Sequence, residues 1–101
     1  MNFNEDELIH SLKVLIKEQN ENETMPYYLV SDVLLAHITY SKNLKEESKA
    51  ILDNLLDQYN KKITILSNFF KGYVIEFRNV LLRSQDDDLL ELTNQIIGRY
   101  F

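Results

Sequence analysis

The sequence predicts an all-α fold, a compact bundle of four to five helices forming a single domain over residues 1–101. A chain of 101 residues is long enough to bury one core but too short for a second. It contains only two glycines and one proline, fewer turn residues than an all-β domain needs. Apolar residues also recur at spacings of three and four between Leu44 and Leu82, as they do in an amphipathic helix.

The densest part of this pattern is an apolar stripe within the central stretch. Its members are Leu52, Leu55, Leu56, Tyr59, Ile63, Leu66, Phe70, Tyr73, Phe77 and Leu81. We expect a long central helix here, covered by the rest of the chain. Gly72 follows Lys71 as a residue just beyond a helix C-terminus would, and glycine costs ~1 kcal/mol in a helix interior. We therefore expect the central helix to be kinked or broken near Gly72.

An α+β fold is the alternative for the same region. Residues 62–66 (KITIL) and 73–77 (YVIEF) are rich in β-branched and aromatic side chains, which favour strands. With residues 67–72 as the connection, they would form a β-hairpin at 62–77. The helical spacing continues through both segments without a change of phase, so we prefer the helical interpretation.

The first helix is expected from Asn4 to Asn20. Asn4 is suited to be the N-cap, and Glu7 stands three residues later, at the capping-box spacing. Phe3 and Leu8 occupy the positions of a hydrophobic staple around this cap.

The second helix is expected from about Pro26 to Tyr40, after a polar loop at residues 20–24. Proline is tolerated in the first turn of a helix because its missing N–H has no partner there. In an alternative interpretation Ser31 and Asp32 cap a shorter helix, and Met25–Val30 is extended.

The third helix is expected to begin near Leu44. Asn43 and Glu46 repeat the spacing of an N-cap and the third helical residue.

The last helix is expected to begin at Ser84 as its N-cap, with Asp87 three residues later. Gly98 is suited to be the residue that follows this helix, which leaves Arg99–Phe101 as a tail.

The charge of the chain is unevenly distributed around a net value of −5. Residues 1–41 carry seven acids and two bases, residues 42–83 eight bases and five acids, and residues 84–101 four acids and one base. We expect the acidic terminal helices to pack against the basic middle. General nucleic-acid affinity is not expected, because it requires a net basic surface.

Two features of the composition bear on location. The chain has no cysteine, so it contains no disulfide and no thiol nucleophile. It contains no signal-peptide pattern and no apolar run of the ~18 residues that a transmembrane helix needs. We expect a cytoplasmic protein without a membrane span.

No set of residues predicts an enzyme, a cofactor site or a metal site. Glu7 and His10 form an E-x-x-H pair, but the second such pair of a carboxylate-bridged metal site is absent. His37 stands at the edge of an apolar helix face, where a partly buried histidine is the simplest explanation. Gly72 and Gly98 are isolated, so no glycine-rich phosphate loop exists.

Adjacent aromatic residues give the strongest indication of function, because a helix cannot bury both members of such a pair against one neighbour. Exposed aromatic side chains are enriched at protein–protein interfaces. The candidate contacts are Tyr28, Phe69, Tyr73, Tyr100 and Phe101. We expect a small non-enzymatic interaction domain of the inhibitor, immunity or antitoxin type, whose partner is an unidentified protein or a second copy in a homodimer.

Two other function classes are alternatives to this hypothesis. The first is a nucleic-acid-binding or regulatory domain that uses the basic central segment, with the hairpin as a wing. The second is a helical bundle that binds a small molecule or a metal ion.

Overall fold

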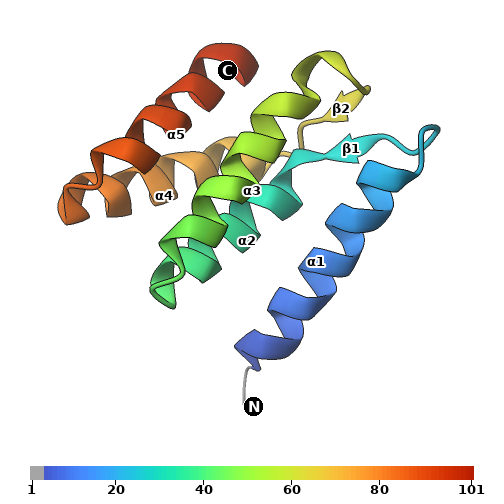
Figure 1. Ribbon diagram of the computed structural model, residues 1–101. Helices are drawn as coiled ribbons and strands as arrows, with labels where there is room; N and C mark the ends of the chain where they lie inside the picture. The colour runs from blue at the N-terminus through green and yellow to red at the C-terminus, as the bar shows by residue number, and fades with distance from the viewer. Residues whose placement is uncertain (1–3) are drawn as a thin grey trace.

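The computed structural model describes residues 4–101, and five α-helices occupy most of this range (Figure 1). The helices are α1 (Glu5–Glu21), α2 (Leu29–Ser41), α3 (Lys45–Asp57), α4 (Phe70–Ser84) and α5 (Asp87–Tyr100). A 3₁₀ turn, η1 (Gln58–Asn60), continues α3, and two short strands, β1 (Tyr27–Tyr28) and β2 (Thr64–Ile65), pair in parallel. The prediction of an all-α bundle of four to five helices is confirmed.

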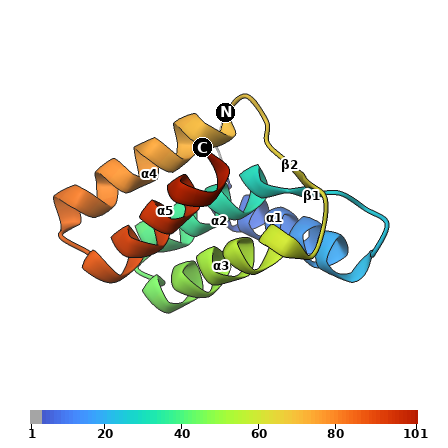
Figure 2. The same ribbon diagram turned by 90° about the horizontal axis from the view of Figure 1, so that it is seen from above.

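Helix α2 lies at the centre of the bundle and packs against α1, α3 and α4, while α5 packs against α3 and α4. Figure 2 shows α1 on one side of α2 and the α4–α5 pair on the other. One core of buried side chains joins these helices: Tyr27, Leu29, Val33, Ala36, Leu52, Leu55, Leu56, Phe70, Val74, Phe77, Leu81, Leu89, Ile96 and Tyr100. Among residues 4–101, no helix has both the length and the apolar character needed to cross a membrane.

The long helix expected between residues 44 and 82 is two helices, and the break lies at residues 58–69 rather than at Gly72. Gly72 is in the first turn of α4 and does not have a positive φ. Residues 64–65 form strand β2 because pairing with β1 holds them, and the Tyr27 N–H donates to the neighbouring Ile63 carbonyl at 2.9 Å. A tertiary contact therefore overrides the helical spacing of the sequence.

The alternative β-hairpin at 62–77 is also not formed. Thr64 and Ile65 of the KITIL segment form a strand, but they pair with β1, while residues 73–77 are helical in α4.

Helix α1 begins as predicted. The Asn4 Oδ1 accepts hydrogen bonds from the backbone N–H groups of Asp6 (3.1 Å) and Glu7 (3.2 Å). The staple expected between Phe3 and Leu8 involves a residue outside the described range.

Helix α2 begins at Leu29, three residues later than the preferred expectation of Pro26. The alternative prediction, an extended segment before a shorter helix, is closer to the structure, because Tyr27 and Tyr28 form β1. Asp32 does not cap the helix but lies buried in its first turn.

The starts of α3 and α5 differ from the predicted caps. Asn43 has a φ of 64°, and its N–H donates to the Tyr40 carbonyl at 3.0 Å, so it ends α2 instead of capping α3. The N-cap of α5 is Asp86, whose Oδ1 accepts the Leu89 N–H at 3.3 Å. Ser84 is instead the last residue of α4.

The predicted end of α5 is also wrong. Gly98 lies within the helix, which continues to Tyr100.

Candidate functional site

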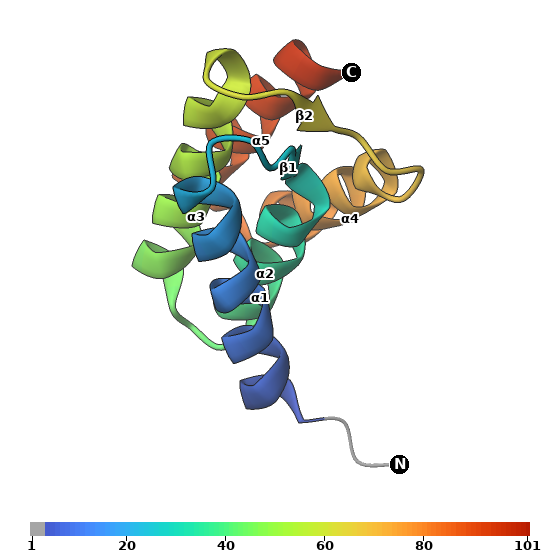
Figure 3. The same cartoon turned by 90° about the vertical axis from the view of Figure 1, so that its right-hand side faces the viewer.

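At one end of the molecule, residues 58–69 cross above β1 between the end of α3 and the start of α4 (Figure 3). Ile63 is 80% exposed and Phe69 is 69% exposed, which is unusual for side chains of this size. We call the exposed apolar residues on the elements that meet here the apolar end: Tyr28, Tyr59, Ile63, Leu66, Phe69 and Phe101.

The backbone that carries these side chains is held by specific contacts. The β1–β2 pairing joins the segment to the start of α2. The Lys62 ammonium donates to the carbonyls of Gln19 and Asn22 (2.6 Å for Asn22), at the C-terminal end of α1. A cation is favourable at this position because the last carbonyls of a helix carry partial negative charge. The apolar side chains are therefore displayed on an anchored segment.

Four of the five predicted contact residues keep some exposure. Tyr28, Phe69 and Phe101 are exposed and Tyr73 is half-buried. The rings of Phe69 and Tyr73 are 6.3 Å apart, centroid to centroid. Phe101 lies edge-on to Phe70 at 6.4 Å. The structure thus brings Phe69 and Tyr73 together, while Phe101 contacts the neighbouring Phe70 instead.

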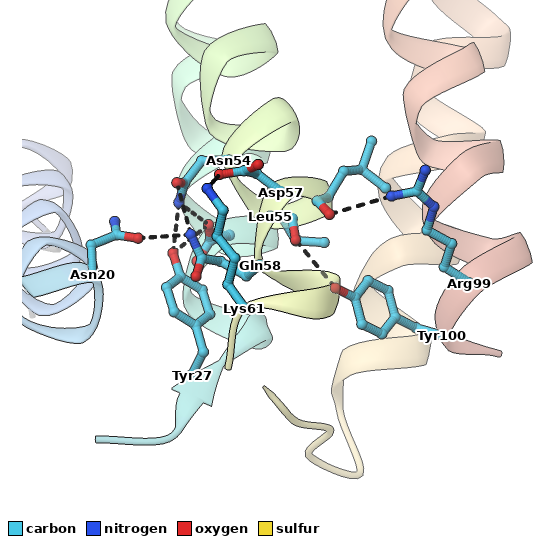
Figure 4. A network of polar contacts seen from close by, with 11 residues as sticks. Asn20, Tyr27, Asn54, Leu55, Asp57, Gln58, Lys61, Arg99 and Tyr100 are labelled. Carbon is cyan, nitrogen blue, oxygen red and sulfur yellow. Dashed lines mark hydrogen bonds and ion pairs between the residues drawn. The ribbon is translucent and has the colours of Figure 1, made fainter. Parts of the chain in front are cut away.

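Tyr100 is the exception among the predicted contacts and belongs to the core. It is only 8% exposed, and its hydroxyl donates to the Leu55 carbonyl at 3.2 Å (Figure 4). Its ring meets Phe70 edge-on at 6.0 Å. The sequence placed it in a tail after Gly98, whereas α5 extends far enough to bury it.

Three members of the apolar end were missed by the sequence analysis. Tyr59, Ile63 and Leu66 were assigned to the buried stripe of a helix that does not continue through them. The signal that favoured the observed state was the β-branched KITIL segment, together with the polar residues 60–62 just before it.

Two basic side chains lie over aromatic rings of the apolar end. Lys71 lies over the Phe101 ring at 5.4 Å and Arg99 over the Tyr59 ring at 5.6 Å, both at cation–π distance. Arg99 also donates to the Leu56 carbonyl at 3.3 Å. Within residues 4–101, neither Lys71 nor Arg99 forms an ion pair with a carboxylate.

A second feature is a cleft between α1 and α3, with α2 as its floor and a volume of about 430 Å³. An ion pair between Lys13 and Glu47 (3.8 Å) crosses it on one side, and Gln58 donates to Asn20 (3.0 Å) where α1 and α3 end. Its surface is mostly apolar. The lining residues are Lys13, Ile16, Lys17, Asn20, Glu21, Asp32, Leu35, Glu47, Ala50, Ile51 and Asn54.

Asp32, on the floor of this cleft, is fully buried. Its Oδ2 accepts hydrogen bonds from the Tyr27 hydroxyl (2.9 Å) and from the Asn54 amide (3.3 Å). The Asn54 amide also donates to the Tyr27 hydroxyl oxygen at 2.7 Å, part of the polar network that Figure 4 shows. Oδ1 has no hydrogen-bond partner among the described residues. Buried polar atoms are rarely left without a partner, so this oxygen requires an explanation.

Burial dominates the acid–base behaviour of this cluster. It raises the pKa of Asp32 to about 7, although the hydrogen bonds from Tyr27 and Asn54 act in the opposite direction. Burial likewise raises the pKa of Tyr27, and the neighbouring Asp32 charge adds to that effect. The Asp32 carboxyl therefore changes between its protonated and ionised forms near neutral pH, inside a largely apolar cleft.

The two histidines lie away from both features. His10 is exposed on α1, as is Glu7, and the described residues contain no group of three or more side chains suited to hold a metal ion. His37 stacks on Phe77 with ring centroids 5.0 Å apart, and its partial burial lowers its pKa.

Comparison with known proteins finds no family model, no curated protein and no solved structure that matches the chain. The apolar end and the cleft are therefore the two features of the molecule that bear on its function.

Proposed function

We propose that the protein acts by binding another protein through the apolar end. The observation that carries this proposal is the exposure of Ile63 and Phe69, at 80% and 69%, on a backbone that β1 and Lys62 anchor. Large apolar side chains presented to water are the typical centre of a protein interface. An anchored backbone reduces the conformational entropy lost on binding.

The charges around the apolar end indicate the chemistry of the partner. Lys71 and Arg99 lie over exposed rings and have no carboxylate partner within residues 4–101. A partner surface that presents apolar side chains flanked by aspartate or glutamate would complement both properties. We propose that the protein is of the inhibitor, immunity or antitoxin type, which acts by binding a partner, and that it works in the cytoplasm.

A nucleic-acid-binding role has less support. In that hypothesis residues 62–77 formed a hairpin wing, and the hairpin is not formed.

The test is affinity capture from the source cell, with the wild-type chain and the double variant Ile63→Ser, Phe69→Ser as paired baits. Serine removes most of the apolar surface of two exposed side chains without opening a cavity in the core. Loss of one interface anchor costs about 2 kcal/mol, which is roughly a thirtyfold weaker Kd. We expect the wild type to retain a partner that the double variant loses.

Leu82→Ser is the matched control, because Leu82 is 44% exposed near the opposite end of α4. It should retain the partner as the wild type does. Sedimentation of the purified chain distinguishes a second copy from a different protein, since a homodimer dissociates in the double variant and persists in Leu82→Ser. A monomer that captures no partner contradicts the proposal, as does a partner that all three baits bind equally.

A further inference from the structure

We propose that the cleft between α1 and α3 is a binding site for a small organic ammonium ion, with its charged head on the Asp32 carboxylate and its apolar body between the helices. The juxtaposition that carries this inference is an apolar cleft of about 430 Å³ with a fully buried carboxylate on its floor, one oxygen of which has no partner within residues 4–101. It does not depend on the proposed protein interface, which lies on different residues.

The shape of the cleft suits a small molecule. Its volume lies within the range of roughly 300–1,000 Å³ that is usual for ligand pockets. Ile16 of α1, Leu35 of α2 and Ile51 of α3 contribute apolar surface from three sides. Apolar walls with a few polar groups that fix orientation are the general pattern of such sites. The body of the ligand is therefore apolar.

The unpartnered oxygen of Asp32 defines the head group. Tyr27 and Asn54 both donate to Oδ2, which leaves Oδ1 as an unused acceptor. An ammonium group provides three N–H donors as well as a positive charge. A hydroxyl would supply a hydrogen bond but would leave a buried negative charge uncompensated, which is costly.

The remaining charges at the cleft largely cancel one another. Lys13 pairs with Glu47 at 3.8 Å, and Lys17 pairs with Glu21 at 4.0 Å. All four side chains are exposed at the mouth, where water screens them, while Tyr27 and Asn54 face Asp32 as neutral donors. The cleft thus has one net negative charge, on Asp32, and complements a monovalent cation.

The test uses 2-phenylethylamine as the probe, with 2-phenylethanol and phenylacetate as the neutral and anionic counterparts of similar size. Binding is followed at pH 8 by amide chemical shifts of the full chain. We expect the amine to bind at least tenfold more tightly than the alcohol, with the shifted amides in α1, α3 and the first turn of α2. Affinity should fall as the pH is lowered from 8 to 5, because protonated Asp32 loses the charge that attracts the amine.

Two variants and one control variant separate the contribution of the carboxylate from that of the cleft. Asp32→Asn keeps the size of the side chain and removes the charge, so amine binding should fall at least tenfold. Asp53→Asn, at an exposed acid of α3, should bind the amine as the wild type does. Ala50→Trp fills the cleft from its lip and leaves Asp32 intact, so it should abolish binding even if Asp32→Asn folds poorly.

Three results would overturn the inference. They are equal binding of amine and alcohol, retention of amine binding in Ala50→Trp, and the absence of binding by the amine to the wild-type chain. The double variant Ile63→Ser, Phe69→Ser should bind the amine normally, so failure of the protein interface and failure of the cleft are distinguishable.

Discussion

Asp32 shows how a single buried residue can both hold the fold and limit its stability. Its carboxyl links β1 to α3 through the Tyr27 hydroxyl and the Asn54 amide, while its own backbone belongs to α2. Burial raises its pKa from 3.8 to about 7, so the folded protein prefers the protonated form. Between these two pH values the unfolded chain ionises Asp32 and the folded chain does not. The unfolded state therefore binds fewer protons, and stability falls as pH rises.

We predict that Asp32→Asn removes this dependence on pH. From pH 4 to pH 7 the free energy of unfolding of the wild type should fall relative to that of the variant, on the order of 1 kcal/mol per pH unit. The difference should become constant above about pH 7, where Asp32 is ionised in both states. Urea unfolding of both chains at several pH values measures it.

Asp53→Asn controls for the loss of one negative charge at an exposed position. A wild-type minus Asp32→Asn difference that stays flat from pH 4 to pH 7 would show that Asp32 is ionised in the folded protein throughout this range.

Backbone conformation gives a second prediction for single residues. Gln85 ends α4 with a φ of 55°, in the left-handed region where side chains other than glycine and asparagine are disfavoured. Gln85→Gly should stabilise the protein by about 0.5–1 kcal/mol, because glycine adopts this conformation without the steric cost that a side chain adds. Asn43→Gly, at a φ of 64°, should give a smaller gain because asparagine already tolerates this conformation. Thermal unfolding of both variants measures the two gains in stability. A larger gain from Asn43→Gly than from Gln85→Gly would contradict the prediction.

At the scale of the helices, both glycines lie where alanine is the better residue. Gly72 is in the first turn of α4 and Gly98 is within α5; neither has a positive φ, and a Cβ at either position meets no atom within 4 Å. Gly72→Ala and Gly98→Ala should therefore each stabilise the protein by about 0.5–1 kcal/mol. Chemical unfolding measures the gain. Destabilisation by Gly98→Ala would mean that Gly98 ends the helix in a left-handed conformation, as its position in the sequence suggested.

The helices show which local signals could be read from the sequence. Helix α1 was predicted from Asn4, whose cap contacts involve only residues two and three positions away. The start of α5 was predicted at Ser84 from the spacing to Asp87, but Asp86 is also suited to be a cap and is the residue that caps the helix. Sequence therefore predicts a helix well where its boundary is stabilised by near neighbours.

Long-range contacts account for what the sequence did not reveal. Residues 59–66 continue the helical spacing, but pairing with β1, more than thirty positions earlier, holds residues 64–65 as a strand. The exposure of Ile63 follows from that pairing and not from its own neighbours. Phe69 was predicted correctly as exposed because it adjoins Phe70, and only one of the two can face the core. The cleft was missed because the partner of Asp32, Asn54, is 22 residues away.

For the molecule as a whole, ion pairs join both acidic ends of the chain to its basic middle, and α5 packs on α3 and α4 as expected, but α1 packs mainly on α2, outside that middle. Lys42 pairs with Asp6 (2.8 Å) at the start of α1, and Lys45 pairs with Asp86 (3.2 Å) at the start of α5. Lys42 and Lys45 flank the turn between α2 and α3, so one turn anchors two helix N-termini. Exposed ion pairs contribute little to stability, and the pairs at Lys42 are largely exposed. Packing on α2 is therefore the main attachment of α1.

We expect α1 to be the helix that separates most easily from the rest of the fold. Only Leu12 and Gln19 of α1 are buried, whereas α2 buries seven residues, and the cleft separates α1 from α3. We predict that amide hydrogen exchange in α1 proceeds through a partial opening of lower free energy than exchange in α2, since local stability follows buried contacts. Native-state exchange at increasing urea concentration measures both free energies, and equal values for α1 and α2 would contradict the prediction.

A ligand in the cleft should raise the free energy of the partial opening of α1, because the ligand contacts α1 and α3 together. Saturating 2-phenylethylamine should slow exchange in α1 more than in α4, since the partial opening of α1 destroys the site and binding opposes it. In Asp32→Asn the same amine concentration should slow exchange in α1 less than in the wild type, because binding is at least tenfold weaker, although α1 should still open more easily than α2. If the amine slows exchange uniformly in all helices, α1 opens only when the whole protein unfolds, and the cleft is then part of a single cooperative unit.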